Sequence, residues 1–310
     1  MAELKRYRAL RATGEIPVDG RLDDPVWAAA PWSDDFIDIE GDAKPRPRFR
    51  TRMKMLWDDG GLAIGADMEE PHVWGTLTEH DSVIFQDNDF EVFLDPDGDH
   101  HMYVELEINA LNTTWDLLLV RPYRDHGPPV DGFELKGLRT AVWVDGTLND
   151  PSDVDRGWSV AIYIPWEALK QVAGCPCPPS AGDIWRINFS RVQWEHDVVD
   201  GRYVRRPGPE DNWVWSPQGV VDMHQPEHWG LLEFVNTTED PQVPYAGLDE
   251  RRRLAEAYHA QRAFRAEHGR WAMTGEVAEG VTFETTSSQF VGRLGKWRID
   301  QESRLTRMAM

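Results

Sequence analysis

The chain has 310 residues, of which 41% are hydrophobic and 28% are charged, a composition typical of a globular protein with a substantial core. Its formal net charge of −21 disfavours nucleic acid and anionic membrane surfaces as partners, because both are negatively charged. No segment approaches the roughly 18 consecutive apolar residues of a transmembrane helix, so we expect no membrane partner.

Residues 1–240 read as a series of short strands, because apolar and polar residues alternate between turns rich in Gly, Asp and Pro. An opening strand and turn are expected over residues 16–27. The strands that follow are expected over 50–57, 62–67, 90–94, 102–108, 115–120, 138–144, 158–164, 185–189 and 230–234. A short helical turn over 166–170 is the main exception. This spacing predicts an all-β fold, an antiparallel β-sandwich of jelly-roll-like form.

Residues 241–310 have a different character. Residues 1–240 contain 22 Lys or Arg against 45 Asp or Glu, whereas residues 241–310 contain 11 against 9. Apolar residues at helical spacing predict a helix over 249–271, and short strands are expected over 281–284, 290–294 and 297–299. We interpret this segment as a helix and a small β extension packed on the sandwich. A separate partner-binding element is the alternative.

Cysteine content and the N-terminus give little information on location. Cys175 and Cys177 are one residue apart and bridge only with strain, so two free thiols in a loop are expected. The first 16 residues lack the apolar run of a signal peptide. The protein either stays in the cytoplasm or is exported and has lost its leader. The charge favours solubility and leaves the oligomeric state open.

Strand alternation gathers polar side chains on one face of the predicted sandwich. Glu91, Glu105, Glu107 and Asn109 fall opposite the apolar residues of their strands, as do Arg186 and Asn188 on a third strand. Such a face offers fixed donors and acceptors for sugar hydroxyls. A merely solvated acidic face is the alternative.

Fifteen tryptophans are more than a core of this size requires, and several follow polar loop residues near this face. Flat aromatic rings suit the C–H faces of a sugar ring. The expected walls of a carbohydrate site comprise Asn112, Trp115, Arg191, Trp194, Asp211, Asn212, Trp213 and Trp215.

The order and spacing of five motifs resemble the family 9 carbohydrate-binding modules and their larger bacterial relatives, over roughly residues 15–236. The motifs are Val18-Asp-Gly-Arg-Leu-Asp-Asp-Pro-Val-Trp27, Leu56-Trp-Asp-Asp-Gly-Gly-Leu62, Asp89-Phe-Glu-Val-Phe-Leu-Asp95, Gly157-Trp-Ser-Val-Ala-Ile-Tyr-Ile-Pro-Trp166 and His228-Trp-Gly230. The resemblance implies a β-sandwich that binds the ends of glycans, with structural calcium in known members.

The family's ligand residues are only partly matched. A family carboxylate matches Glu91 and a family asparagine matches Asn109. The two tryptophans that clamp the sugar in related modules align with Phe85 and Met223, and a ligand arginine aligns with Glu107. The family's standard ligand is therefore not implied for this chain.

One loop offers candidate metal ligands. Asp95, Asp97 and Asp99 bring hard carboxylate oxygens close together, which suits structural Ca²⁺. Asp-Gly is also a common turn, so a metal-free loop is the alternative. The histidines at 100, 101 and 224 are interpreted as loop residues rather than metal ligands.

A carbohydrate-active enzyme is the main alternative to a binding protein, because glycosidases work with two carboxylates. Glu105 and Glu107 lie two residues apart, with roughly 6.5–7 Å between their Cβ atoms, which permits either glycosidase geometry. Asp116 and Glu195 are further candidates for a catalytic pair. A structural or partner-binding role is the third hypothesis.

Overall fold

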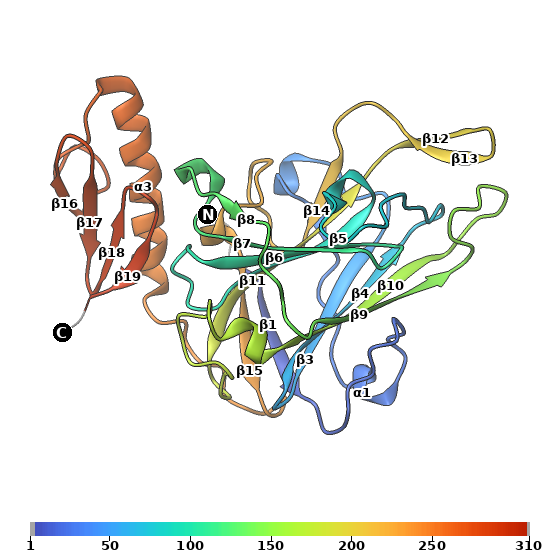
Figure 1. Cartoon of the computed structure of the whole chain (residues 1–310). Helices are drawn as coiled ribbons and strands as arrows, with labels where there is room; N and C mark the ends of the chain where they lie inside the picture. Colours follow the sequence, from blue (N-terminus) through green and yellow to red (C-terminus); the bar gives the residue numbers. More distant parts are fainter. Residues whose placement is uncertain (1–3, 309–310) are drawn as a thin grey trace.

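The computed structural model describes residues 4–308, and its main element is one large, strongly curled sheet (Figure 1). The strand order is β8-β7-β6-β5-β11-β15-β1-β3-β4-β10-β9, and β14 and β2 extend from β11. One half contains β2 (Ile37–Asp38), β5 (Asp89–Asp95), β6 (Tyr103–Asn109), β7 (Thr114–Leu119), β8 (Pro129–Val130), β11 (Ile184–Gln193) and β14 (Asp211–Val214). The rest contains β1 (Arg6–Arg11), β3 (Thr51–Trp57), β4 (Gly61–Glu69), β9 (Arg139–Asp145), β10 (Gly157–Pro165) and β15 (Gly230–Val235).

The expectation of a purely antiparallel sheet is wrong, because the sheet is mixed. β1 runs parallel to both of its neighbours, β15 and β3, while the other ladders of the described sheet are antiparallel. The buried Glu233 carboxylate accepts a hydrogen bond from Arg6 and pairs with Arg8, which ties β1 to β15. The opening strand expected over 16–27 is absent, and its end forms the short helix α1 (Pro25–Ala28), capped by Asp24.

The two halves of the curled sheet enclose one hydrophobic core, as the layers of a sandwich do. Val92 and Leu106 contribute from one half, and Met55, Ile64 and Ile162 from the other. All five side chains are 2% exposed or less. The alternation that separates core residues from polar residues on β5, β6 and β11 therefore matches the expected pattern.

A second apolar cluster covers part of the opposite face of β5, β6 and β7. It includes Phe93, Tyr103, Leu117, Met223 and Trp229. The loop over residues 215–229 crosses this face, and Arg186 and Asn188 bind its backbone carbonyls at Trp229 and Ser216. The polar face predicted from the sequence is consequently a covered layer rather than an open surface.

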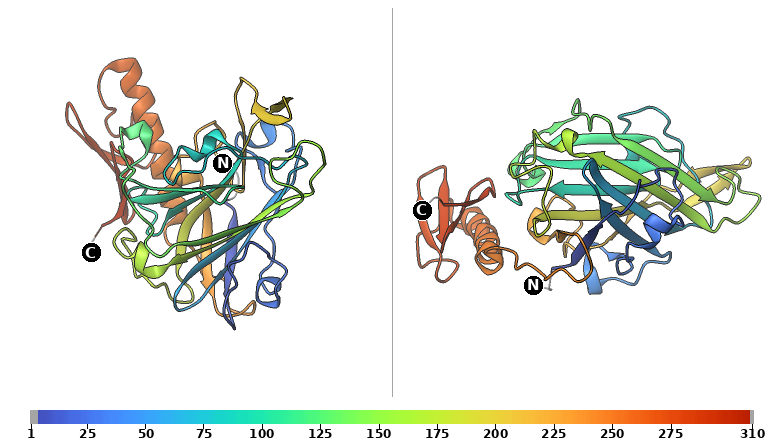
Figure 2. Two further views of the ribbon diagram at one scale, coloured as in Figure 1. Left: turned by 45° about the vertical axis from the view of Figure 1, so that its right-hand side comes forward. Right: turned by 90° about the horizontal axis from the view of Figure 1, so that it is seen from below.

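The C-terminal segment forms a unit with its own core. Helix α3 (Leu248–His268) packs on an antiparallel sheet of β16 (Thr282–Thr285), β17 (Phe290–Leu294), β18 (Trp297–Asp300) and β19 (Leu305–Arg307). Leu254, Tyr258, Trp271, Phe290 and Ile299 lie in the core between them. Figures 1 and 2 place α3 between this small sheet and the large one, so the helix faces the sandwich.

Smaller elements complete the described chain. The hairpin of β12 (His196–Val199) and β13 (Arg202–Arg205) projects from the large sheet, away from the C-terminal unit (Figure 1). The remaining helices are α2 (Trp166–Leu169) and the 3₁₀ turns η1 (Gly41–Ala43), η2 (Ile84–Gln86), η3 (Tyr123–Asp125) and η4 (Pro226–His228). Cys175 and Cys177 are free thiols, as expected. No helix among residues 4–308 is both long and apolar enough to cross a membrane.

Candidate functional site

A small pocket of about 210 Å³ opens on the face of β5, β6 and β7 that points away from the main core. Its floor follows from strand register. Glu91 on β5 lies directly opposite Glu107 on β6, and Glu105 lies opposite Phe93. Trp115 on β7 is paired with Glu107, so its ring reaches the same place. Alternation therefore delivers three carboxylates and an indole to one cavity.

The three carboxylates are almost completely buried, with Glu91 and Glu105 5% exposed and Glu107 2% exposed. Burial raises the pKa of Glu91 to about 7, and the Glu210 carboxylate adds to this shift. Burial also raises the pKa values of Glu105 and Glu107 well above the ordinary range, and in both cases the Glu91 charge contributes. The unliganded pocket thus favours protonated over ionised carboxyls.

Below these residues lies Asp89, which is fully buried. Its Oδ1 accepts a hydrogen bond from the Val192 amide, whereas its Oδ2 has no partner among the described residues. Oxygens of Asp89, Glu91 and Glu107 lie within 4.8 Å of one another. Burial and the Glu91 charge raise the pKa of Asp89. The pocket floor is therefore a concentrated group of acidic side chains.

Aromatic and apolar side chains form the walls. Phe85 and Tyr123 are 38% and 43% exposed, so both rings are accessible at the wall of the pocket. The Tyr123 ring lies 4.4 Å from the ring of His224 and nearly perpendicular to it. The complete lining comprises Ile39, Phe85, Glu91, Phe93, Glu105, Glu107, Trp115, Tyr123, Val192, Glu210, Asn212, Val221, Asp222, Met223 and His224.

Hydrogen bonds fix the walls to the floor. The Phe85 amide donates to Glu107 Oε2 at 2.8 Å, and Trp194 Nε1 donates to the Phe85 carbonyl at 2.8 Å. Across the pocket, the Tyr103 hydroxyl is hydrogen-bonded to His224 Nδ1 at 2.9 Å. Burial lowers the pKa of His224 to about 4, so its ring is neutral at physiological pH.

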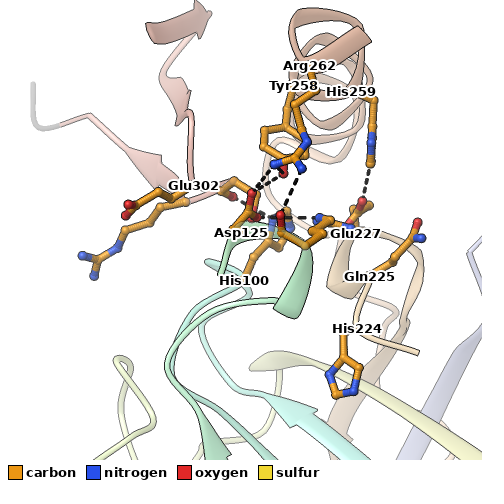
Figure 3. Close-up of polar contacts among 12 residues, drawn as sticks. His100, Asp125, His224, Gln225, Glu227, Tyr258, His259, Arg262 and Glu302 are labelled. Atoms are coloured by element: carbon orange, nitrogen blue, oxygen red, sulfur yellow. Dashed lines mark hydrogen bonds and ion pairs between the residues drawn. The ribbon is translucent and has the colours of Figure 1, made fainter. Parts of the chain in front are cut away.

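The wall that contains Tyr123 and His224 is attached to the C-terminal unit (Figure 3). Tyr123 belongs to η3, which ends at Asp125, and His224 precedes Glu227 of η4 by three residues. His259 of α3 is 2.7 Å from Glu227, in a contact between Nε2 and Oε1. Both loops on this side of the pocket thus end in a residue that contacts α3.

Asp125 is the centre of that attachment, and its side chain is 1% exposed. It accepts hydrogen bonds from the Tyr258 hydroxyl, from Arg262 Nη1 at 2.8 Å and from Ser303 Oγ at 2.8 Å. Arg124, its neighbour, forms a 2.8 Å ion pair with Glu227 and so joins the two loops. The sequence pattern did not indicate this network, because its members are far apart along the chain.

The Asp95–Asp99 loop lies at the far end of β5, against the C-terminal unit. One oxygen each from Asp95, Asp97 and Asp99 fall within 4.8 Å of one another. Burial raises the pKa values of Asp95 and Asp97, and charge repulsion within the group adds to it. Arg304 Nε donates to Asp99 Oδ2 at 3.0 Å. The loop therefore combines convergent oxygens with a contact to the tail.

Residues 18–173 match the family model described as carbohydrate family 9 binding domain-like, which is half of the chain. The chain belongs to this family. No curated protein sequence matches it significantly.

Three solved structures are similar to the chain. A protein from Bacteroides uniformis, proposed to bind carbohydrate, is 16% identical with a TM-score of 0.54, over 75% of this chain and 100% of that one. A family 9 module from Caldicellulosiruptor kristjanssonii in complex with cellotriose is 17% identical with a TM-score of 0.49, over 78% of this chain and 99% of that one. The glucose complex from that organism is 17% identical with the same score, over 76% and 99%. At 16% identity, the similarity to the Bacteroides uniformis structure shows the fold alone.

The pocket on β5, β6 and β7 contains five of the predicted ligand residues, namely Glu91, Glu105, Glu107, Trp115 and Asn212. It also contains Phe85 and Met223, the two positions aligned with the sugar-clamping tryptophans of related modules. Phe85 is well exposed, whereas Met223 is 8% exposed.

The other predicted wall residues lie elsewhere. Trp213 and Trp215 are 3% and 2% exposed and belong to the main core, so they cannot form a wall without unfolding. Both tryptophans are buried because β14 and the residue after it pack against the core, which the loop-like sequence did not reveal. Trp194 packs behind Phe85 and is 8% exposed. These three tryptophans therefore support the pocket or the core rather than line the pocket.

The polar residues predicted for the site divide in the same way. Asn109 is buried and donates to the Leu77 carbonyl and to Asp87, so it has a structural role. Arg191 is fully buried in an ion pair with Glu70. Asn112 is exposed in the β6–β7 turn with a φ of 64°, and Asp211 pairs with Arg48. None of these four lines the pocket.

Of the four catalytic candidates, only Glu105 and Glu107 reach the pocket. Asp116 points away from it and accepts a hydrogen bond from the Leu135 amide. Glu195 pairs with Arg48 and Arg206 at the hairpin. Tyr123 and Val221 were missed, because irregular loops have no periodicity that reports which way a side chain points.

Proposed function

We propose that the chain binds carbohydrate in the pocket of β5, β6 and β7. The observation that carries this proposal is the convergence of Glu91, Glu105 and Glu107 with the indole of Trp115 in one cavity. Carboxyls fixed by strands can hydrogen-bond sugar hydroxyls, and an aromatic ring packs on the C–H face of the sugar. Family membership supports the same class of ligand.

The size of the pocket supports recognition of a single sugar ring or a chain end. At about 210 Å³ it is smaller than the cavities of about 300–1,000 Å³ that take drug-sized ligands. Tyr123 and Phe85 stand at its rim, where a second ring of an oligosaccharide would pass. A long polysaccharide would therefore be held at one end rather than along its length.

A glycoside hydrolase is the alternative, and the ionisation of the pocket does not favour it. Hydrolysis requires one protonated carboxyl and one carboxylate, with their pKa values moved apart by their surroundings. Here burial moves the pKa values of Glu91, Glu105 and Glu107 in the same direction. The direction of these shifts therefore does not distinguish an acid from a base among the three carboxyls.

Calorimetric titration with a panel of mono- and oligosaccharides tests the proposal. A ligand found in the panel should bind at least about tenfold more weakly to Glu91→Gln or Trp115→Ala, since each removes a direct contact worth about 1.4 kcal/mol or more. Glu239→Gln, an exposed change on a distant turn, is the matched control. Reducing-sugar release from the same ligand would instead favour the hydrolase. Absence of binding across the panel would refute both.

We further propose Ca²⁺ as a structural ligand of Asp95, Asp97 and Asp99. Calcium–oxygen distances of about 2.3–2.6 Å place ligand oxygens up to about 5 Å apart, and the oxygens of these residues lie within 4.8 Å. The donor set, three carboxylates in one loop, is the one that calcium prefers. A bound ion would fix the loop against the C-terminal unit, and it is not required for the sugar pocket.

A further inference from the structure

The charge of the pocket is unusual for a sugar site. Among the described residues that line it, five are acidic, namely Glu91, Glu105, Glu107, Glu210 and Asp222, and none is Lys or Arg. His224 is the one basic side chain of this lining, and burial keeps it neutral. A neutral sugar needs donors as well as acceptors, because its hydroxyl oxygens accept hydrogen bonds. When its carboxyls are ionised, the pocket supplies many more acceptors than donors.

Hydrogen-bond partners for these carboxyls are few among the described residues. Glu105 is only 5% exposed and lines the cavity. It nevertheless accepts no hydrogen bond from residues 4–308. Glu107 accepts one, from the Phe85 amide. Buried carboxylates are normally paired or coordinated, because an isolated buried charge is costly. An unpartnered carboxyl that faces a cavity indicates a ligand that brings the missing donor.

A cation with several donors would satisfy this group. Glu91 and Glu107 face each other across the β5–β6 ladder, and Glu105 lies two residues from Glu107 on the same face. An ammonium group carries three N–H donors, so it can bond to more than one of these carboxylates at once. Its charge would also stabilise their ionised forms, which burial alone disfavours.

The walls distinguish an organic cation from a bare metal ion. Trp115, Tyr123 and Phe85 present aromatic surface to the same cavity. A metal ion uses none of this surface and fills a small part of 210 Å³. A sugar ring fills the space and packs on the aromatic rings, as the proposed function requires. The ligand that uses both floor and walls is a pyranose with an amino group.

We propose that the pocket is specific for amino sugars, with the ammonium group of one hexosamine ring held by Glu91, Glu105 and Glu107. This rests on the proposed carbohydrate binding and adds the chemical class of the ligand. Sugars with a free amine bind, and their N-acetylated forms, which have lost the charge, bind poorly.

Three monosaccharides that differ at one position test this. Glucose, glucosamine and N-acetylglucosamine share a ring and carry a hydroxyl, an ammonium or an acetamide at C2. Titrated below the pKa of the amine, glucosamine should bind at least about tenfold more tightly than the other two. Equal or weaker binding of glucosamine would overturn the inference. Monosaccharides are preferable to polymers, because a polycation would bind a chain of net charge −21 through its surface alone.

Two conservative variants locate the preference. Glu105→Gln and Glu107→Gln keep the shape of the side chain and remove its charge, so the ratio of glucosamine to glucose affinity should fall to within about twofold. Glu239→Gln, on an exposed turn, should retain the full ratio. A ratio that survives both pocket changes would show that the ammonium binds elsewhere. Circular dichroism of each variant confirms that it is folded.

The remaining outcomes separate this inference from the proposed function. If glucose binds as well as glucosamine and Glu91→Gln abolishes both, the amino-sugar inference fails while carbohydrate binding stands. If no sugar of the wider panel binds, both fail. A metal-mediated site is tested by repeating the titrations after EDTA and with Ca²⁺, Mg²⁺ or Zn²⁺ alone. Metal binding that Glu107→Gln removes, together with sugar binding that EDTA abolishes, would overturn the inference in favour of a metal.

Discussion

Glu91 shows how a single buried carboxyl can lower the stability of the fold. A carboxyl on a central strand that is 5% exposed loses hydration, and no cationic side chain of the pocket compensates for it. Nearby Glu105 and Glu107 are in the same position. Ionisable groups with shifted pKa values that gather in one cavity are characteristic of functional sites. Apolar residues in the same positions would stabilise the fold better.

Glu91→Gln should make stability less sensitive to pH. The pKa of Glu91 is about 7 in the folded protein against 4.5 for the ordinary group, so the folded state holds a proton that the unfolded state has lost. Wild-type stability therefore falls as the pH rises from about 4.5 through about 7. The variant, which cannot ionise, should be more stable relative to wild type at pH 8 than at pH 5 by about 2 kcal/mol. Urea denaturation at both pH values measures this, and an identical pH dependence in the two proteins would contradict it.

Asp97 provides a test of the proposed calcium site. Saturating Ca²⁺ should raise the melting temperature of the wild type, because an ion that binds only the folded state at about 100 times its Kd adds about 2.7 kcal/mol. Asp97→Asn should lose most of this gain, whereas Asp153→Asn, on an exposed turn, should keep it. Thermal scans with EDTA or Ca²⁺ supply the comparison. A wild-type melting temperature that is the same with EDTA and with Ca²⁺ would contradict the proposed calcium site.

Among the larger elements, α3 acts on the pocket through its contacts with η3 and η4. Asp125 and Glu227 are buried carboxylates that meet α3, and each lies within three residues of a pocket wall residue. The pKa of Glu227 is held well below its usual range, by the Arg124 charge and by the contact with His259 against the opposing effect of burial. The C-terminal unit therefore supports one wall of the pocket.

Tyr258→Phe should weaken that support. The change removes the hydroxyl that donates to Asp125 and leaves a buried carboxylate with one donor fewer, at a cost of about 1–3 kcal/mol. Hydrogen exchange should quicken over residues 121–127 and 222–229, both of which contain pocket residues. Glu267→Gln on the exposed side of α3 is the control. Unchanged exchange in these two loops would show that α3 and the pocket are independent.

The strands that could be predicted are those whose pattern is local. Hydrophobic alternation located β3 to β7, β9 to β11 and β15 to within a few residues, and helical spacing located α3. β1 was missed because its partners, β15 and β3, are distant in sequence and its Arg-rich pattern resembles an exposed segment. A parallel strand is not joined to its neighbours by a hairpin turn, so the sequence lacks the turn residues that would indicate its pairing.

The floor of the site was predictable and its walls were not, for the same reason. Glu91, Glu105 and Glu107 occupy strands, where a period of two fixes the direction of each side chain. Trp213 and Trp215 lie in a segment whose turn residues suggested a loop. Residues 211–214 instead pair with β11, and both tryptophans are buried in the main core. Tyr123 lies two residues before Asp125, which contacts residues of the C-terminal unit more than 100 positions away in sequence.

Across the whole molecule, two cores are joined by polar contacts rather than by one continuous apolar interface. The core of the curled sheet and that of α3 with β16–β19 share no residue among those described. Between them lie Asp125, Glu227 and the Asp95–Asp99 loop, with Arg251 and Arg304 from the C-terminal segment. The more acidic first 240 residues thus meet a slightly basic tail.

The net charge predicts the class of polymer that the chain avoids. Many of its arginines are engaged by carboxylates, as in the pairs of Arg48 with Asp211 and of Arg52 with Asp67, so they neutralise protein charge rather than bind phosphate. At −21, association with a polyanion is opposed by a field that salt only partly screens, with a Debye length of about 8 Å at physiological ionic strength. Duplex DNA and heparin should therefore cause no mobility shift at about 150 mM salt. Chitosan, a polymer of opposite charge, should bind at low salt and serve as the positive control. A mobility shift with DNA at about 150 mM salt would show a basic surface that the net charge hides.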